Sequence, residues 1–263
     1  MKLTFLGTGA ADWRAEHKKT HGAEYRRYAS ILINNDLLID PGPMIFEIAD
    51  DLNINLKAVE NILITHTHPD HFSPETLMRL HAIGGHNYIW GNKDCINSGN
   101  MLKLNDILAF FSIEPSLPIR IGNYQVIPVK ANHFIDSVYE EQAYHYIISE
   151  GSKTIFYGCD GAWLFNEAWQ EIRKHHFDAI ILDTTFGDVV DGRIFAHNNL
   201  KMVLLMVEAF KKSNIIKETG KVYVTHLARS AHKSHAQLQA DMTPYGIQVA
   251  YDGMVVNLDE QAE

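Results

Sequence analysis

The chain has 263 residues, of which 46% are hydrophobic and 21% are charged, and its formal net charge is -9. This composition excludes a disordered, collagen-like or low-complexity chain. No apolar run approaches the roughly 20 residues of a membrane helix, and the first residues show no signal-peptide pattern, so we expect a cytoplasmic protein without membrane contact. The acidic balance argues against an extended nucleic-acid partner. Two cysteines are too few for a disulfide framework or a four-cysteine zinc site.

Short apolar runs alternate with segments of helical spacing along the whole chain. Runs typical of strands cover residues 3–6, 29–34, 37–40, 59–65, 124–129, 143–149, 154–157, 179–182, 222–225 and 247–251. Helical spacing predicts helices over residues 74–81, 163–174, 200–210 and 234–242. No repeat, flexible linker or long charge run divides the chain. We therefore interpret residues 1–263 as one α/β domain of layered helices and sheets.

Residues 10–28 interrupt this alternation, because they are polar and show no periodicity. Residues 14–27 contain five lysines and arginines against two glutamates, a local excess of three positive charges. A long loop inside a compact domain is often functional. Two interpretations stay open: a solvated surface loop, or an active-site loop whose cations, such as Arg26 and Arg27, contact an anionic substrate.

The densest chemical signal is the segment His66-Thr67-His68-Pro69-Asp70-His71, which follows the apolar residues 61–64. In an extended chain, residues two apart project to the same side, so His66 and His68 can reach one ion together. Asp70 and His71 then fall on the following turn, where they can address a second ion. Imidazole and carboxylate groups are ligands of zinc, manganese and iron. The alternative, a polar histidine-rich loop, needs four ligand-type residues in six positions by coincidence.

This motif after a buried strand resembles the signature of the metallo-β-lactamase fold hydrolases. Three further residues match the remaining ligands of that family in the same order, namely His133, Asp160 and His226. The resemblance implies an αββα sandwich, in which two mixed sheets are covered by helices, with two divalent metal ions at one edge of the sheets. The same ligands serve zinc, manganese and iron, so the sequence leaves the metal open.

The resemblance also implies how the ligands divide between the two ions. One metal would be held by His66, His68, His133 and Asp160. The other would be held by Asp70, His71, Asp160 and His226, so that Asp160 bridges the ions. Asp40, in the segment Leu38-Ile39-Asp40-Pro41-Gly42, resembles the family's aspartate that orients a ligating histidine.

A second match narrows the resemblance to the phosphodiesterase branch of the family, which includes ribonuclease Z and phosphoribosyl cyclic phosphate phosphodiesterase. It rests on residues 181–186, which include Asp183, and on residues 196–200, which include His197. In this branch an additional histidine, supported by an acidic residue, faces the scissile phosphate. The resemblance assigns these roles to His197 and Asp183. We expect His197 to open a helix, whose N–H groups favour an anion; the alternative is that it only caps that helix.

The implied reaction is two-metal hydrolysis, in which a metal-bridging hydroxide displaces the leaving group of a phosphodiester in line. His197 would donate a hydrogen bond or a proton to the phosphate or the leaving oxygen. Asp183 would orient His197, and the ligand Asp70 belongs with the catalytic residues. Arg229, three residues after His226, is a candidate phosphate contact, with an ordinary surface cation as the alternative.

A small phosphodiester, cyclic ones included, fits this sequence better than tRNA. Only 22 residues, 161–182, separate Asp160 from Asp183, which leaves no room for the inserted arm with which ribonuclease Z grips tRNA. Two alternatives remain. An ester or lactone hydrolase of the same fold would not need His197, and a non-hydrolytic metal-binding protein of the pyrroloquinoline quinone-associated type usually shows eroded ligands. A homodimer is expected only because it is the commonest closed assembly.

Overall fold

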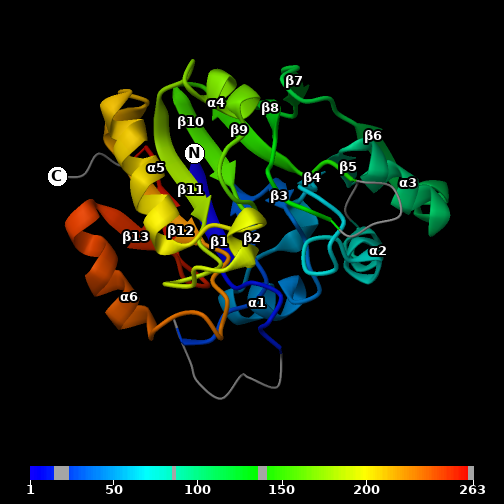
Figure 1. Cartoon of the computed structure of the whole chain (residues 1–263). Coiled ribbons are helices and arrows are strands. Elements are labelled where there is room, and N and C mark those ends of the chain that lie inside the picture. Colours follow the sequence, from blue (N-terminus) through cyan, green and yellow to red (C-terminus); the bar gives the residue numbers. More distant parts are fainter. Residues whose placement is uncertain (15–23, 85–86, 136–140, 260–263) are drawn as a thin grey trace.

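The computed structural model describes residues 1–14, 24–84, 87–135 and 141–259, and consists of two stacked seven-stranded sheets with helices on their outer faces (Figure 1). The middle of the expected active-site loop, residues 15–23, lies outside the described residues. No described helix is long and apolar enough to cross a membrane.

The first sheet contains the N-terminal strand at its second position. Its strands, in spatial order, are β14 (Val255–Asn257), β1 (Lys2–Gly7), β2 (Ser30–Ile33), β3 (Leu37–Ile39), β4 (Asn61–Leu63), β5 (Tyr88–Gly91) and β6 (Ala109–Ser112). The neighbours from β14 to β3 are antiparallel, and those from β3 to β6 are parallel. The sheet is therefore mixed, as expected.

The second sheet repeats this division into an antiparallel and a parallel half. Its strands, in spatial order, are β13 (Ile247–Val249), β12 (Ile216–Thr225), β11 (Phe177–Asp183), β10 (Lys153–Gly158), β9 (Tyr144–Glu150), β8 (Tyr124–Lys130) and β7 (Ile119–Ile121). The neighbours from β7 to β10 are antiparallel, and those from β10 to β13 are parallel. The loops that follow parallel strands of one sheet leave it at the same edge, which is where ligands bind in such sheets.

The main core fills the space between the two sheets. Phe5 and Ile31 of the first sheet pack there with Tyr146, Ile181 and other residues of the second, all fully or almost fully buried. The strands read as nearly continuous apolar runs because their opposite faces are buried too, beneath helices. Packing on both faces holds in place the strands whose ends carry the candidate site.

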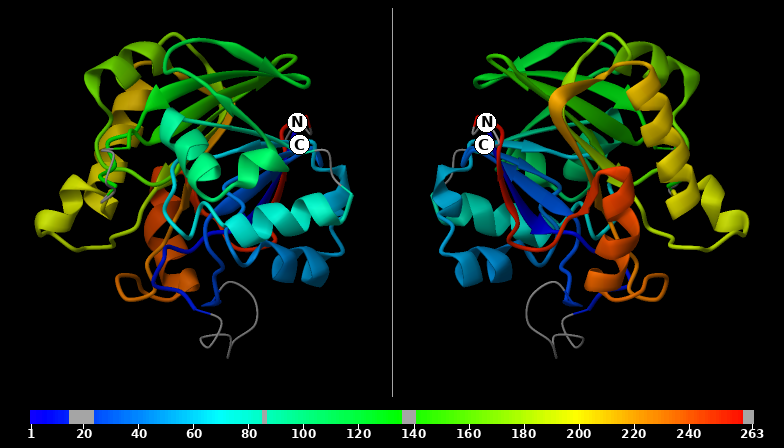
Figure 2. Two further views of the ribbon diagram at one scale, coloured as in Figure 1. Left: turned by 90° about the vertical axis from the view of Figure 1, so that its right-hand side faces the viewer. Right: turned by 90° about the vertical axis from the view of Figure 1, so that its left-hand side faces the viewer.

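Helices cover both outer faces and complete four layers (Figure 2). The first sheet is covered by α1 (Ile45–Leu52), α2 (Pro74–Ala82) and α3 (Lys93–Met101), and the second by α4 (Asn166–Ile172), α5 (Leu200–Lys212) and α6 (His235–Met242). In α5 the buried positions, such as Val203, Val207 and Phe210, recur at helical spacing and face the sheet. The αββα sandwich expected from the sequence is therefore confirmed.

The elements that the sequence did not predict are short or polar. They are α1, α3, β5, β6, β7 and β14. Each of these strands has only three or four residues, and α3 is rich in asparagine, glycine and serine, so neither apolar length nor periodicity marks it. The helix expected over 163–174 is shorter, because α4 begins at Asn166.

The inter-sheet core makes a quantitative prediction. Ile181 lies in β11 with no exposed surface and packs between the sheets. We expect Ile181→Ala to lower the free energy of unfolding by about 2–5 kcal/mol, because it removes buried methyl groups and leaves a cavity. Urea denaturation measures this, with Leu205→Ala as the control, since Leu205 is 57% exposed on α5 and its truncation should cost less than about 0.5 kcal/mol. Equal losses in both variants would contradict the packing.

Candidate metal centre

The candidate ligands stand just beyond the ends of strands from both sheets. The segment of residues 66–71 follows β4, while His133 follows β8, Asp160 follows β10 and His226 follows β12. Asp40 directly follows β3, and Asp183 is the last residue of β11. The structure therefore brings together residues from six strand ends at one edge of the sandwich.

Three of these residues have a left-handed backbone, which side chains with a Cβ rarely adopt. The φ angles are 54° at Asp40, 59° at Asp160 and 59° at His226. Such a conformation costs of order 1–3 kcal/mol and persists where the surroundings enforce it, commonly at functional sites. Here the left-handed residue turns the chain sharply at the end of the strand, so that the side chain stays at the sheet edge.

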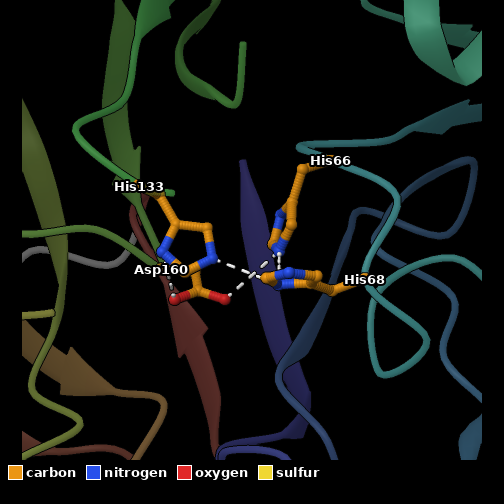
Figure 3. Close-up of side chains that lie close together, drawn as sticks. All are labelled: His66, His68, His133 and Asp160. Carbon is orange, nitrogen blue, oxygen red and sulfur yellow. Dashed lines mark hydrogen bonds and ion pairs between the residues drawn. The ribbon is translucent and has the colours of Figure 1, made fainter. Parts of the chain in front are cut away.

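The first group of ligands meets at the ring of His68 (Figure 3). His66 Nε2 lies 2.9 Å and His133 Nε2 lies 3.1 Å from His68 Nδ1, and Asp160 Oδ2 lies 3.3 Å from His66 Nε2. These four residues form a cluster with the spacing of a metal site. They are the set that the sequence resemblance implied for one metal.

The second group adjoins the first through Asp160. His71 Nε2 lies 3.3 Å from both Asp70 Oδ2 and His226 Nε2. Asp160 Oδ2 is 3.1 Å from His71 Nε2 and 3.5 Å from His226 Nε2. The same carboxylate oxygen thus faces nitrogens of both groups, which is the position that a bridging ligand would need.

The chain reaches this arrangement only because the loop after β3 carries a glycine. A Cβ atom on Gly42 would lie 2.1 Å from the carbonyl oxygen of Asp70. The two loops can therefore touch only with a hydrogen at that position. This contact holds the Asp70 turn against the segment that contains Asp40.

Hydrogen bonds fix which nitrogen of His66 and His71 faces the centre. Asp40 accepts from the backbone N–H and the hydroxyl of Thr65, both at 2.8 Å, and from His71 Nδ1 at 2.9 Å. The Thr65 hydroxyl donates its hydrogen to Asp40, so it accepts from His66 Nδ1 at 2.9 Å. Both rings therefore carry a hydrogen on Nδ1, and a neutral ring then presents a lone pair on Nε2.

A matching hydrogen-bond network lies at the strand ends of the other sheet. The hydroxyl of Thr185 donates to Asp183 Oδ2 at 2.8 Å and accepts from His226 Nδ1 at 2.7 Å and from His197 Nδ1 at 3.1 Å. Asp183 also accepts from the backbone N–H groups of Thr185 and Asn198. Asp183 is fully buried, so it anchors the loop that carries His197.

The structure corrects the expected place of His197. It follows a short 3-10 helix of residues Gly192–Phe195 and does not open or cap α5, because the side chain of Asn199 caps that helix by accepting from Met202 N. Its Nδ1 instead lies 2.8 Å from Asp160 Oδ1 and 3.2 Å from Asp183 Oδ2. His197 also belongs to a third cluster with metal-site spacing, formed with Asp160, Asp183 and His226. Two roles are therefore open to it, a ligand or a donor toward a substrate.

Burial and charge divide the histidines into two kinds. Burial holds the pKa of His66, His68 and His133 below its usual value. Burial also disfavours the charged form of His197 and His226, but the carboxylates around them, chiefly Asp160 and Asp183, together outweigh it and raise the pKa of His197 to about 10 and that of His226 to about 9. The neighbouring histidines hold the pKa of Asp160 well below its usual range although burial opposes this.

The donor set fits divalent metal ions. His66 Nε2 has a lone pair, and so does His133 Nε2, because His133 Nδ1 donates to the Ala196 carbonyl at 3.1 Å. Both lone pairs face the same atom, His68 Nδ1. A single proton on that atom can satisfy one of them, whereas a cation can accept all three nitrogens and the Asp160 carboxylate.

Several residues of this centre were missed from the sequence. Glu141 accepts from the Thr67 backbone N–H at 3.0 Å, from the Thr67 hydroxyl and from Asn92 at 2.7 Å, so it pins the chain between His66 and His68. His145 Nε2 contacts the carbonyl of Asp160 at 3.3 Å. Thr65 directly precedes His66 and Thr185 lies two positions after Asp183, so each stands close to a predicted site residue, whereas nothing local marks Glu141.

The three arginines proposed as substrate contacts lie outside the ligand clusters. The structure corrects the prediction that Arg27 contacts a substrate. Its buried guanidinium pairs with Glu47 at 2.8 Å, Asp51 at 2.5 Å and Asp252 at 3.6 Å, and so holds segments of the fold together. Arg26 is also buried. Arg229 is exposed, and its backbone N–H donates to Asp12 at 2.8 Å.

Comparison with known proteins identifies the family. The family model described as "Beta-lactamase superfamily domain" matches residues 35–227. This match spans most of the chain, and the chain therefore belongs to the beta-lactamase superfamily. No curated protein matches it by sequence.

Solved structures of the same fold cover nearly the whole chain. The metallo-beta-lactamase fold protein YhfI from Bacillus subtilis matches with a TM-score of 0.71 and 18% identity, over 97% of this chain and 99% of that one. A diphosphatase from the PhnP family matches with a TM-score of 0.74 and 20% identity, over 97% and 96%. Zn(2+)-bound PqqB from Methylobacterium extorquens matches with a TM-score of 0.74 and 14% identity, over 98% and 100%. At these identities the likeness establishes the fold alone.

The contacts of Asp40 generate a test of the centre. We expect Asp40→Asn to weaken metal binding by about 10- to 100-fold, because the amide cannot accept from Thr65 and His71 as a carboxylate does. Asparagine tolerates the left-handed backbone of this position, so the variant should fold. Competition with a chromogenic chelator measures the affinity, and Asp50→Asn on the exposed side of α1 is the control. Unchanged affinity in Asp40→Asn would remove Asp40 from the centre.

The raised pKa of His226 predicts that metal affinity increases with pH. A ligating histidine must lose the proton that competes with the metal. Because the pKa of His226 is about 9 and that of His71 is also raised, these protons remain bound at neutral pH. Affinity should rise by roughly tenfold per pH unit for each displaced proton from neutral pH up to about pH 9. Calorimetry in buffers of different ionisation enthalpy counts the released protons, and a release of none at pH 7 would contradict the ligand set.

Proposed function

We propose that this protein is a dinuclear metal-dependent phosphodiesterase that acts on a small phosphodiester. The observation that supports it most directly is the placement of His197 beside Asp160 and Asp183. An ester or lactone hydrolase of this fold needs the metal ligands but has no evident need for an additional histidine held by a buried carboxylate. Solved structures of the fold include proteins named as a diphosphatase and as human tRNase Z.

Two clusters of residues would hold the metals. The first consists of His66, His68, His133 and Asp160, and the second of Asp70, His71, His226 and the shared Asp160. When bound, two divalent ions would supply an activated water and would stabilise the charge that develops on the phosphoryl group. The histidine donors suit zinc, manganese and iron.

The side chains of the centre have separate tasks in this proposal. Without bound metal, the Asp160 and Asp183 carboxylates raise the pKa of His197 to about 10 although burial opposes this, which favours a protonated ring. Its Nδ1–H is engaged by carboxylates, so its Nε2–H is the group that can donate to a phosphoryl oxygen or to the leaving oxygen. Asp183 and Thr185 hold the ring at this position.

The turnover of a chromogenic phosphodiester tests the proposed function. We expect the protein loaded with zinc or manganese to hydrolyse it and Asp70→Ala to lose this activity, because Asp70 belongs to the second ligand group. A lactone and a carboxylic ester are assayed in parallel. Turnover of the lactone with none of the phosphodiester would select the ester or lactone alternative. A loaded protein with no turnover at all would favour a metal-binding role without hydrolysis.

The role of His197 is tested separately from metal binding. We expect His197→Ala to keep both metals, measured by elemental analysis, and to lose phosphodiesterase rate by about 10²- to 10⁴-fold, as is typical of a lost proton donor. His81→Ala, a change of an ordinary helix histidine in α2, provides the matched control. Loss of metal from His197→Ala would make His197 a ligand, and an unchanged rate would exclude both roles.

A further inference from the structure

A second site with the character of a ligand pocket lies beside the metal centre. Its volume is about 260 Å³, and its walls come from Trp13, from residues 24–26 and from the segment 227–238. In Figure 1 the blue segment near residue 24 lies next to the orange segment that leads into α6. We call it the Arg26 pocket. None of the described residues that line it is one of the clustered candidate metal ligands.

Arg26 is a buried cation that forms no direct ion pair with a carboxylate among the described residues. It is only 4% exposed; its guanidinium donates to the Thr8 hydroxyl and the Ala250 carbonyl, both at 2.6 Å, and lies 3.1 Å from His235 Nδ1. Among the described residues no carboxylate forms an ion pair with it, whereas the adjacent Arg27 pairs with three. Burial lowers the pKa of Arg26 to about 10 although the Asp252 and Glu24 carboxylates act against this, so the buried charge is only partly balanced. The pocket in front of Arg26 is therefore electrostatically suited to an anion.

The amino end of α6 adds to this preference. His235 is the first residue of α6, and its backbone N–H donates to Glu24 Oε1 at 3.1 Å. Helix amino ends attract anions because their N–H groups lack partners in the helix. The exposed Glu24 thus supplies a carboxylate oxygen inside the pocket. We interpret this carboxylate as occupying part of the space of an external anion.

Further cationic side chains border the pocket. Arg229 lines it, and no hydrogen bond or ion pair of its guanidinium is found within the described ranges. Lys233 also lines it and pairs with Asp241 at 2.9 Å. Three basic residues, Arg26, Arg229 and Lys233, thus line the pocket, and Glu24 is the one acidic residue among its described lining residues, in a protein whose overall charge is -9.

We propose that the Arg26 pocket binds a phosphate group. Arg26, Arg229 and the amino end of α6 would contact its oxygens, since guanidinium groups and helix N–H groups match phosphate geometry. The pocket volume of about 260 Å³ admits a phosphate together with one or two small groups bonded to it. Glu24 would leave the helix end when the phosphate enters.

The pocket shares a chain segment with the metal centre. The wall segment begins directly after His226, and the Ala228 N–H donates to the Thr185 carbonyl at 3.2 Å. His232 Nε2 donates to the Thr184 carbonyl at 2.7 Å. The phosphate can belong to a free anion that acts on this segment, or to a terminal phosphate of the hydrolysed molecule. The second source rests on the proposed function, whereas the binding itself does not.

Binding of inorganic phosphate to the metal-free protein tests the pocket without reference to hydrolysis. Calorimetry measures the affinity, and quenching of Trp13 fluorescence reports the location, with Trp13→Phe as the control for that signal. We expect Arg229→Ala to weaken binding by roughly tenfold or more, because a charge-assisted hydrogen bond is lost. We expect Glu24→Gln to tighten it, because the competing carboxylate becomes neutral. Both residues are exposed, so these variants avoid the folding risk of altering buried Arg26.

The matched control is Arg173→Ala, which removes an exposed arginine at the end of α4, away from the pocket. It should bind phosphate as the unaltered protein does. If neither Arg229→Ala nor Glu24→Gln changes phosphate binding, the anion binds outside the Arg26 pocket, for example at the histidine cluster. That result would overturn the proposal. An absence of any binding would overturn it too.

Kinetics of the metal-loaded protein then identify the source of the phosphate. If it is part of the substrate, a phosphodiester with a terminal phosphate should have a KM lower than its analogue without one, and Arg229→Ala should remove this difference. If it is a free anion, the two substrates should have equal KM values, and added phosphate should change the rate in the unaltered protein but not in Arg229→Ala. Failure of all hydrolysis would contradict the proposed function and leave the binding result standing.

Discussion

Two buried carboxylates, Asp40 and Asp183, determine the arrangement of the candidate metal centre. Each lies at the carboxyl end of a strand in a different sheet, and each holds a threonine hydroxyl that in turn accepts from a histidine. A carboxylate can only accept hydrogen bonds, so this chain of contacts sets the direction of every hydrogen in it. The result is that His66 and His226 turn their Nε2 atoms to the centre. The orientation of these two rings thus follows from their own hydrogen bonds.

The ligands could be predicted from the sequence because their chemistry is concentrated. His66, His68, Asp70 and His71 fall within six residues after an apolar run, and the other three follow predicted strands in the family's order. The layered fold was also predictable, since long buried strands such as β8 to β12 have continuous apolar runs. Short strands at the sheet margins, such as β6 and β14, gave no such signal, because pairing with a neighbour rather than their own sequence makes them strands.

The supporting contacts could not be predicted, because they join residues that are distant in the chain. Glu141 meets Thr67 across 74 positions, and no local pattern marks either of them. Arg27 was expected at a substrate because it lies in a basic segment, but tertiary contacts with three carboxylates engage it instead. His197 was placed at the start of a helix from its position before residues 200–210, whereas Asn199 has the better capping side chain. In each case the sequence identified the residue type and not its partner.

Because buried ligand atoms converge at the strand ends, the stability of the folded protein depends on its metal. In the first group, the lone pairs of His66 and His133 converge on His68 Nδ1 and repel unless a cation or a proton lies among them, and three left-handed residues add backbone strain at the same place. Metal ions that bind only the folded chain therefore contribute directly to its stability. A cell short of metal would hold a larger unfolded fraction of this protein, and proteases act on that fraction. Its abundance, as well as its activity, would then follow the metal supply.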